Sequence, residues 1–173
     1  MRPLPNTFPS YFNTYIKLIP EGNVSVALTK NLSKAEAFFN LISEEQSQYS
    51  YANGKWTVKE ILQHIIDAER IFCYRALSIT RKEPATLPSF DENKYAANSL
   101  ANNRSWNDLT KEFQVVRQSS ILLFNSFTNE KLECIGNISD YTMSVLALGY
   151  TIAGHTAHHI QIIRERYLDI DFH

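Results

Sequence analysis

Apolar residues recur at helical spacing along long stretches of this chain that contain few proline or glycine residues. In the first stretch they return every three or four positions, which predicts a helix from Val24 to Gln48. In the second, Thr57 and Glu60 form a T-x-x-E capping box, and one apolar face follows as far as Thr80. The pattern therefore predicts two helices in the first half of the chain.

The second half of the chain contains two more stretches of this kind. Ser105 is a suitable cap for a third helix over 106–127, and a fourth helix is expected over about 143–167. The connector 129–141 has no clear conformation, and no segment has the pattern of a convincing strand. Four amphipathic helices predict an all-α fold, a four-helix bundle.

Two segments outside these helices bear on the domain organisation. Residues 81–104 read as a long loop between helices 2 and 3, with a short helical turn around 93–98. Loops of this length are often lids or binding loops, but a simple crossover between helices fits equally well. Residues 1–20, with prolines at positions 3, 5 and 9, are expected to be an extended N-terminal segment of one domain spanning 1–173.

Composition narrows the range of functions. The chain has 173 residues, of which 44% are hydrophobic and 20% charged, as in ordinary soluble domains. A net charge of −1 gives no electrostatic reason to expect a nucleic acid or membrane partner, and no apolar run is long enough to span a bilayer. With only Cys73 and Cys134, a disulfide framework is not expected. We therefore expect a cytoplasmic protein with reduced thiols that acts on a small molecule.

The histidines carry the clearest chemical signal. Three of the five lie in GHTAHH, residues 154–159, where His155 and His159 share one helix face. Imidazoles at this spacing can direct nitrogens to one ion at the Zn–N distance of about 2.0–2.1 Å. His158 could instead pair with His155. However, the residues that share its helix face are mostly polar or small, so His158 is expected to face solvent or a neighbouring helix. His64 lies beside apolar residues at the core edge of the second helix.

These histidines can also be interpreted without a metal ion. A lone His64 on an apolar flank is more often a core histidine than a ligand, and an H-x-x-x-H pair often arises by chance. Three inward histidines on two helices make a stronger case, because each is costly to bury without a partner. His173 ends the chain and is left out. The sequence thus predicts one divalent metal ion, bound by His64, His155 and His159, with an open position as in catalytic sites. Three imidazoles suit zinc, nickel, copper or iron.

The neighbours of these histidines suggest supporting roles. Glu60 and Asp67 lie one turn either side of His64 and could orient an imidazole or accept a proton. Surface charge is the simpler interpretation, and for Glu60 the capping box is already an explanation. Arg117 could pair with an acidic substrate or with Glu69, or simply extend from a core edge to solvent.

The two cysteines are weaker candidates for the site. Cys73 lies nine residues after His64, which places it about half a turn round the helix, so its thiol is expected to point away from the ion. Cys134 lies in a connector and is kept as an alternative metal ligand.

Three segments resemble the DinB-like metal-binding family, which includes YfiT-like proteins. Residues 55–77 and 152–163 resemble its second and fourth helices, and 87–95 its intervening loop. The likeness extends over about residues 20–167. It implies an up-and-down-type four-helix bundle, often dimeric, with a divalent metal ion, zinc or nickel, on His64, His155 and His159.

The resemblance also implies candidate activities. Some members are metal-dependent S-transferases that use a low-molecular-weight thiol or thiol-dependent isomerases, and many are described as hydrolases. It therefore implies a metal-dependent enzyme of the thiol S-transferase type acting on a small electrophile. A hydrolase using metal-bound water and a non-catalytic metal- or ligand-binding stress-response protein are the alternatives, and the sequence shows no clear general base to choose between them.

Overall fold

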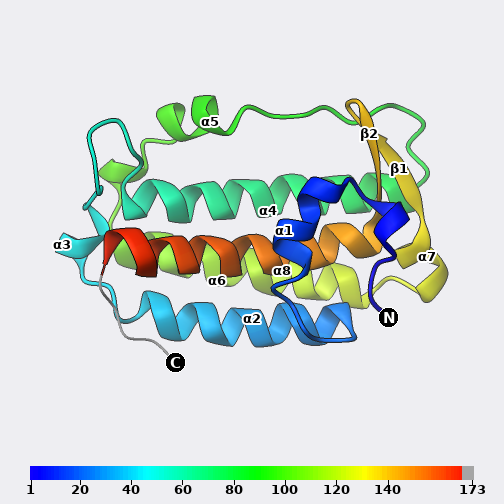
Figure 1. Cartoon of the computed structure of the whole chain (residues 1–173), viewed down its shortest axis with the longest axis horizontal. Coiled ribbons are helices and arrows are strands. Elements are labelled where there is room, and N and C mark those ends of the chain that lie inside the picture. Colours follow the sequence, from blue (N-terminus) through cyan, green and yellow to red (C-terminus); the bar gives the residue numbers. More distant parts are fainter. Residues whose placement is uncertain (169–173) are drawn as a thin grey trace.

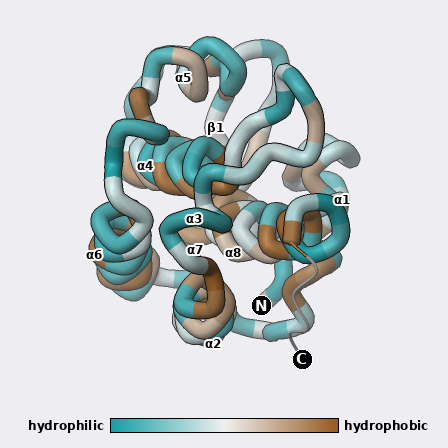
Figure 2. Tube along the Cα trace, turned by 90° about the vertical axis from the view of Figure 1, so that its left-hand side faces the viewer, coloured by the Kyte–Doolittle hydropathy of each residue, from teal (hydrophilic) through white to brown (hydrophobic). Residues whose placement is uncertain are grey.

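Four long helices form the body of the molecule. The computed structural model describes residues 1–168. The long helices are α2 (Val24–Phe39), α4 (Val58–Thr80), α6 (Trp106–Asn125) and α8 (Val145–Ile162), and α8 continues as a π-helical turn over Ile163–Tyr167. They pack as a four-helix bundle, with α2 opposite α4 and α6 opposite α8 (Figures 1 and 2). The predicted all-α bundle is confirmed, and no helix within residues 1–168 has both the length and the apolar character to cross a bilayer.

The topology of the bundle differs from the up-and-down arrangement that the resemblance implied. Neighbouring helices α4 and α6 run in the same direction, and α2 and α8 run in the other (Figure 1). The first turns of α4 and α6 meet at Glu44, which pairs with Lys59 and accepts a hydrogen bond from the backbone N–H of Trp106 at 2.7 Å. Parallel neighbours require a long return connection, and residues 81–105 supply it.

This return connection, called the crossover below, is residues 81–105. It contains α5 (Glu92–Asn98) and the 3-10 turn Ala101–Asn103, so it is not a plain loop. The helical turn expected around 93–98 corresponds to α5. Asp91 caps α5 by accepting a hydrogen bond from the backbone N–H of Lys94 at 3.0 Å.

The first predicted helix is shorter than expected. Helix α2 ends at Phe39, and a separate helix α3 (Glu44–Ser47) follows, so the prediction of one helix to Gln48 is wrong. Ser43 and Gln46 form a second capping box, which starts a new helix instead of continuing the old one. The box of Thr57 and Glu60 at the start of α4 is confirmed.

The connector after α6 contains strands that the sequence pattern did not predict. Helix α7 (Asn129–Glu133) is followed by an antiparallel hairpin of β1 (Ile135–Ile138) and β2 (Tyr141–Ser144). A two-stranded hairpin is marginal by itself, so its four-residue strands depend on packing at the end of the bundle. There Gly136 faces the side chain of Ile79 too closely to allow a Cβ atom, and Leu87 of the crossover pairs with Ile138.

The N-terminal segment, residues 1–20, is folded and not extended as expected. It forms 3-10 turns over Pro5–Thr7 and Ser10–Phe12 and the short helix α1 (Asn13–Ile16), which lies against α8 (Figure 1). Proline fixes φ near the helical value, so prolines that suggested extended chain also suit the first residue of a helical turn. The Tyr150 hydroxyl of α8 donates to the Glu21 carbonyl at 2.6 Å and thus holds the end of this segment.

Candidate metal centre

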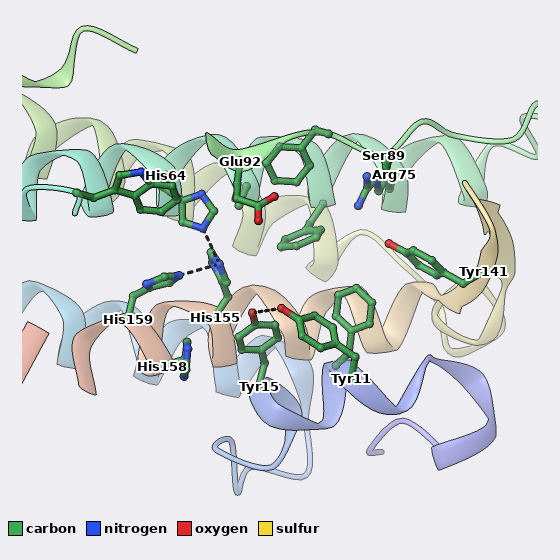
Figure 3. Close-up of a pocket in the computed structure, with 15 residues that line it drawn as sticks. Tyr11, Tyr15, His64, Arg75, Ser89, Glu92, Tyr141, His155, His158 and His159 are labelled. Carbon is green, nitrogen blue, oxygen red and sulfur yellow. Dashed lines mark hydrogen bonds between the residues drawn. The ribbon is translucent and has the colours of Figure 1, made fainter. Parts of the chain in front are cut away.

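Three histidine side chains from two helices meet inside the bundle. His64 projects from the N-terminal half of α4, and His155 and His159 project from α8 one turn apart (Figure 3). The Nε2 atom of His155 lies 3.1 Å from Nε2 of His64 and 3.1 Å from Nε2 of His159. All three ligand atoms lie within 4.8 Å of one another. The structure therefore brings together the three residues that the sequence selected, called the histidine triad below.

The spacing of these nitrogens suits a common ion. Two nitrogens bound tetrahedrally to one zinc ion at 2.0–2.1 Å lie about 3.3 Å apart. Hydrogen bonding explains the arrangement less well, because a ring nitrogen offers either one hydrogen or one lone pair, and Nε2 of His155 has two equally close partners. The residues present fit a divalent metal ion.

Burial keeps the triad in the form that binds metal. Desolvation lowers the pKa of His64 to about 4. It also holds the pKa values of His155 and His159 well below the usual range, and for His155 the neighbouring rings of His159 and His64 add to the effect. Neutral imidazoles are the required ligands, so an ion displaces no proton from these positions at neutral pH.

His158 is not part of the triad. Its ring packs on the edge of the Tyr15 ring of α1, with centroids 5.3 Å apart, and Tyr15 lies equally close to His155. His158 therefore faces a neighbouring helix, one of the two environments expected for it. His173 lies outside the described residues.

Neither acidic residue beside His64 orients its ring. Glu60 accepts a hydrogen bond from the Thr57 backbone N–H, and Asp67 accepts one from Gln63 at 2.9 Å. The Nδ1 atom of His64 is buried without a partner among residues 1–168, so the expectation that Glu60 or Asp67 orients this ring is wrong. Both carboxylates are engaged by these other partners, and the Trp56 ring packs against His64 instead, with centroids 5.0 Å apart.

Both cysteine thiols lie away from the triad. Cys73 donates to the Ser120 hydroxyl on α6 at 3.1 Å, which confirms that it points away from His64, and burial raises its pKa to about 12. Cys134 hydrogen-bonds to the Glu130 carbonyl at 3.3 Å, beyond the far end of α6. Neither thiol is a ligand in this arrangement.

Arg117 has a structural role close to the site. Its guanidinium is fully buried and forms a two-pronged ion pair with Glu69, with N–O distances of 2.7 and 2.9 Å. It also donates to the Thr156 hydroxyl, next to His155, at 2.9 Å. Of the interpretations left open for Arg117, pairing with Glu69 is confirmed. The pair ties α4 and α6 to α8 directly behind the triad.

A cavity of about 300 Å³ opens beside the triad. Seven aromatic residues form much of its wall: Tyr11, Phe12, Tyr15, Trp56, Phe72, Phe90 and Tyr141. Ser89, Phe90 and Glu92 of the crossover also line it, so this connection both links two helices and forms part of the cavity wall.

The cavity also holds residues that sequence reasoning missed. Glu92 points toward the cavity beside His64, and Arg75 lies farther along α4 (Figure 3). The capping of α5 by Asp91 was the available signal for Glu92, because a cap fixes the residue after it in the first helical turn. Tyr15 also lines the cavity, and burial raises the pKa of its hydroxyl above the usual value.

Comparison with known sequences gives a family and one relative. The sequence profile of the DinB superfamily matches residues 27–163, which include the whole triad. A protein of Oceanobacillus iheyensis named "Putative metal-dependent hydrolase OB0413" is 24% identical over 127 residues, which make up 72% of each chain.

Comparison with solved structures supports the fold. YfiT from Bacillus subtilis, described as a probable metal-dependent hydrolase with an unusual four-helix bundle topology, superposes with a TM-score of 0.66 at 15% identity. That match covers 88% of this chain and 97% of YfiT. A mycothiol-dependent maleylpyruvate isomerase gives a TM-score of 0.68 at 11% identity, over 84% of this chain and 61% of the isomerase. Similarity at this level of identity shows a common fold.

Proposed function

Because this chain belongs to the DinB superfamily and its histidine triad borders a cavity, we propose that it is a metal-dependent enzyme acting on a small electrophilic molecule. The proposal rests above all on the two 3.1 Å separations that join Nε2 of His155 to Nε2 of His64 and of His159. A divalent ion held there, zinc or nickel, would supply a Lewis acid able to ionise a thiol or a water molecule at neutral pH. Three protein ligands leave a coordination position for such a molecule.

The proposed nucleophile is a low-molecular-weight thiol, which makes the reaction an S-transfer. The protein's own thiols do not face the cavity, since Cys73 is buried against Ser120, so a sulfur nucleophile has to enter from solvent. Three neutral imidazoles leave the ion's charge uncompensated by its ligands, which favours an anionic thiolate as the next ligand. A thiol-dependent isomerase with a similar fold agrees with this choice.

The chain's own residues supply a base and an apolar environment. Glu92 faces the cavity, and its negative charge acts on His64, where it raises the pKa against the larger effect of burial. This carboxylate is therefore suited to accept the proton of an incoming thiol or water molecule. The rings of Phe72 and Phe90 limit water around an electrophile bound between them.

Hydrolysis is the second candidate function. The Glu92 carboxylate could activate water as readily as a thiol, and the names of two similar proteins point to hydrolases. We further propose that the protein functions in the cytoplasm as a homodimer, without nucleic acid or membrane partners. Light scattering on the purified chain tests the dimer.

The test is a conjugation assay on purified full-length protein of known metal content. We expect conjugation of an electrophile such as monochlorobimane with at least one of glutathione, cysteine or bacillithiol. Activity should be lost in His159→Ala and retained in His158→Ala, the neighbouring histidine outside the triad. Turnover without any thiol would support hydrolysis, and a metal-loaded, folded protein inactive on esters and electrophiles would support the non-catalytic binding role.

A further inference from the structure

Arg75 lies on the same face of α4 as His64, at the opposite end of the cavity. The two residues are eleven positions apart, which is about three helical turns, a rotation of only about 20° and a rise of about 16 Å between Cα atoms. Both line the cavity beside the triad, together with Phe72 between them. Figure 3 shows Arg75 near Ser89 and Tyr141, away from the three histidines. The cavity is thus elongated, with the triad at one end and a cation at the other.

Arg75 is a buried cation without a counter-ion. Only 3% of its surface is exposed, yet no carboxylate within residues 1–168 forms an ion pair with it. One terminal nitrogen, Nη2, donates to the Pro88 carbonyl at 2.7 Å, and the buried Nε has no acceptor in the same part of the chain. Arg117, the other deeply buried arginine, is fully paired with Glu69. A buried charge is costly unless it is paired, so Arg75 lacks a partner that Arg117 has.

The surroundings of Arg75 hold its guanidinium in place without neutralising it. The Phe72 and Phe90 rings lie 5.8 and 6.0 Å from its Cζ atom, within the range of a cation–π contact. Tyr141 lies beside it, and the positive charge of Arg75 partly offsets the burial that raises the pKa of the Tyr141 hydroxyl. A planar guanidinium held in this way offers paired N–H donors to a carboxylate.

We propose that Arg75 binds a carboxylate group of the small-molecule ligand, whose reactive end lies at the histidine triad. The inference rests on the proposed function in one respect, that the triad marks the reacting end. Glu92 sets the orientation of the ligand in the cavity, because its carboxylate lies at the triad end and would repel the carboxylate of the ligand there. The ligand is therefore an elongated carboxylate with an apolar middle section between the aromatic rings.

A purely structural role for Arg75 makes a different prediction. Its bond to Pro88 holds the crossover against α4, and losing that bond would weaken binding of charged and neutral ligands alike. The relative affinity of a carboxylate and a neutral analogue separates the two roles.

The experiment compares 4-phenylbutyrate with 4-phenylbutan-1-ol by calorimetry on the full-length protein. We expect the acid to bind about tenfold more tightly than the alcohol, a ratio that corresponds to about 1.4 kcal/mol. The preference should disappear in Arg75→Gln and persist in part in Arg75→Lys. Arg70→Gln, which removes an exposed arginine of the same helix, should leave it unchanged.

Two further arms make the result decisive. The preference should survive in His159→Ala, so a failure of the metal chemistry and a failure of the carboxylate site are distinguishable. In wild-type protein, the NMR chemical shift of the Arg75 Nε–H should change when the acid is added and should not change when the alcohol is added. This measurement tests the contact even if Arg75→Gln does not fold. Equal binding of acid and alcohol by wild type, or an acid preference that survives Arg75→Gln, would overturn the proposal.

Discussion

Gly154 of α8 lies directly against the backbone carbonyl of Tyr15 in α1, so closely that a Cβ atom at position 154 would overlap the carbonyl oxygen. This contact lets α1 cross α8 at the level of the triad. It brings the Tyr15 ring to 5.3 Å, centroid to centroid, from the rings of both His155 and His158. The N-terminal segment is therefore a wall of the cavity, and a glycine next to a predicted metal ligand permits its position.

The first prediction concerns this contact. Alanine in place of glycine inside a helix normally stabilises by up to about 1 kcal/mol. Gly154→Ala should instead destabilise the protein by about 1–3 kcal/mol, because the backbone of α1 has to move. Urea unfolding measures the difference. Gly22→Ala is the control, since a Cβ there meets nothing within 4 Å, and a stabilised Gly154→Ala variant would show that α1 does not dock as described.

The second prediction concerns the ion pair behind the triad. Arg117→Met leaves the buried carboxylate of Glu69 without its partner, so it should lower the free energy of unfolding by about 3–5 kcal/mol. Adding Glu69→Leu should recover most of this loss. Arg70→Ala, which breaks an exposed pair with Glu112, should cost less than about 1 kcal/mol. Equal losses from Arg117→Met and Arg70→Ala would contradict the described burial.

The third prediction concerns the pH dependence of stability in metal-free protein. The pKa of His64 is about 4 when folded and about 6.5 when unfolded, so between these values the unfolded state binds more protons. Stability should therefore fall as the pH drops from 7 to 5, and His64 alone should account for on the order of 2 kcal/mol of the fall at pH 5. Denaturant melts of wild type and His64→Gln measure this contribution. Parallel pH profiles for the two proteins would show that His64 is not buried in a neutral form.

The fourth prediction concerns Glu92. If its carboxylate accepts the proton of the nucleophile, Glu92→Gln should reduce turnover about 100-fold and leave bound metal unchanged. Glu83→Gln provides a control, because Glu83 lies in the same crossover but lines a different cavity. A loss of metal together with activity would make Glu92 a ligand, and unchanged turnover would remove it from the reaction.

Local signals in the sequence were enough to predict the main helices and the three histidines that meet in the triad. The capping box at Thr57 fixed the start of α4, and the spacing of His155 and His159 put both on one face of α8. These features depend on residues within one or two helical turns of each other. The selection of His64 used the same logic, since only one face of α4 could meet a partner helix in a bundle.

Features that depend on distant contacts were not predicted. The parallel course of α4 and α6 depends on a return path through residues 81–105, which no short-range pattern specifies. The folded form of the N-terminal segment was not predicted. Its helix α1 packs against Gly154, which is more than a hundred residues away in the chain, and no local pattern shows this contact. No short-range pattern marks Arg75, because its burial without a carboxylate partner within residues 1–168 depends on contacts with the crossover.

The most direct test of the central claim is X-ray absorption spectroscopy on the metal-loaded protein, combined with metal analysis. We predict one divalent ion per chain, with three imidazole nitrogens at about 2.0–2.1 Å if the ion is zinc, and loss of the ion in His64→Ala. Metal content and a first coordination shell that are unchanged in His64→Ala would contradict this prediction.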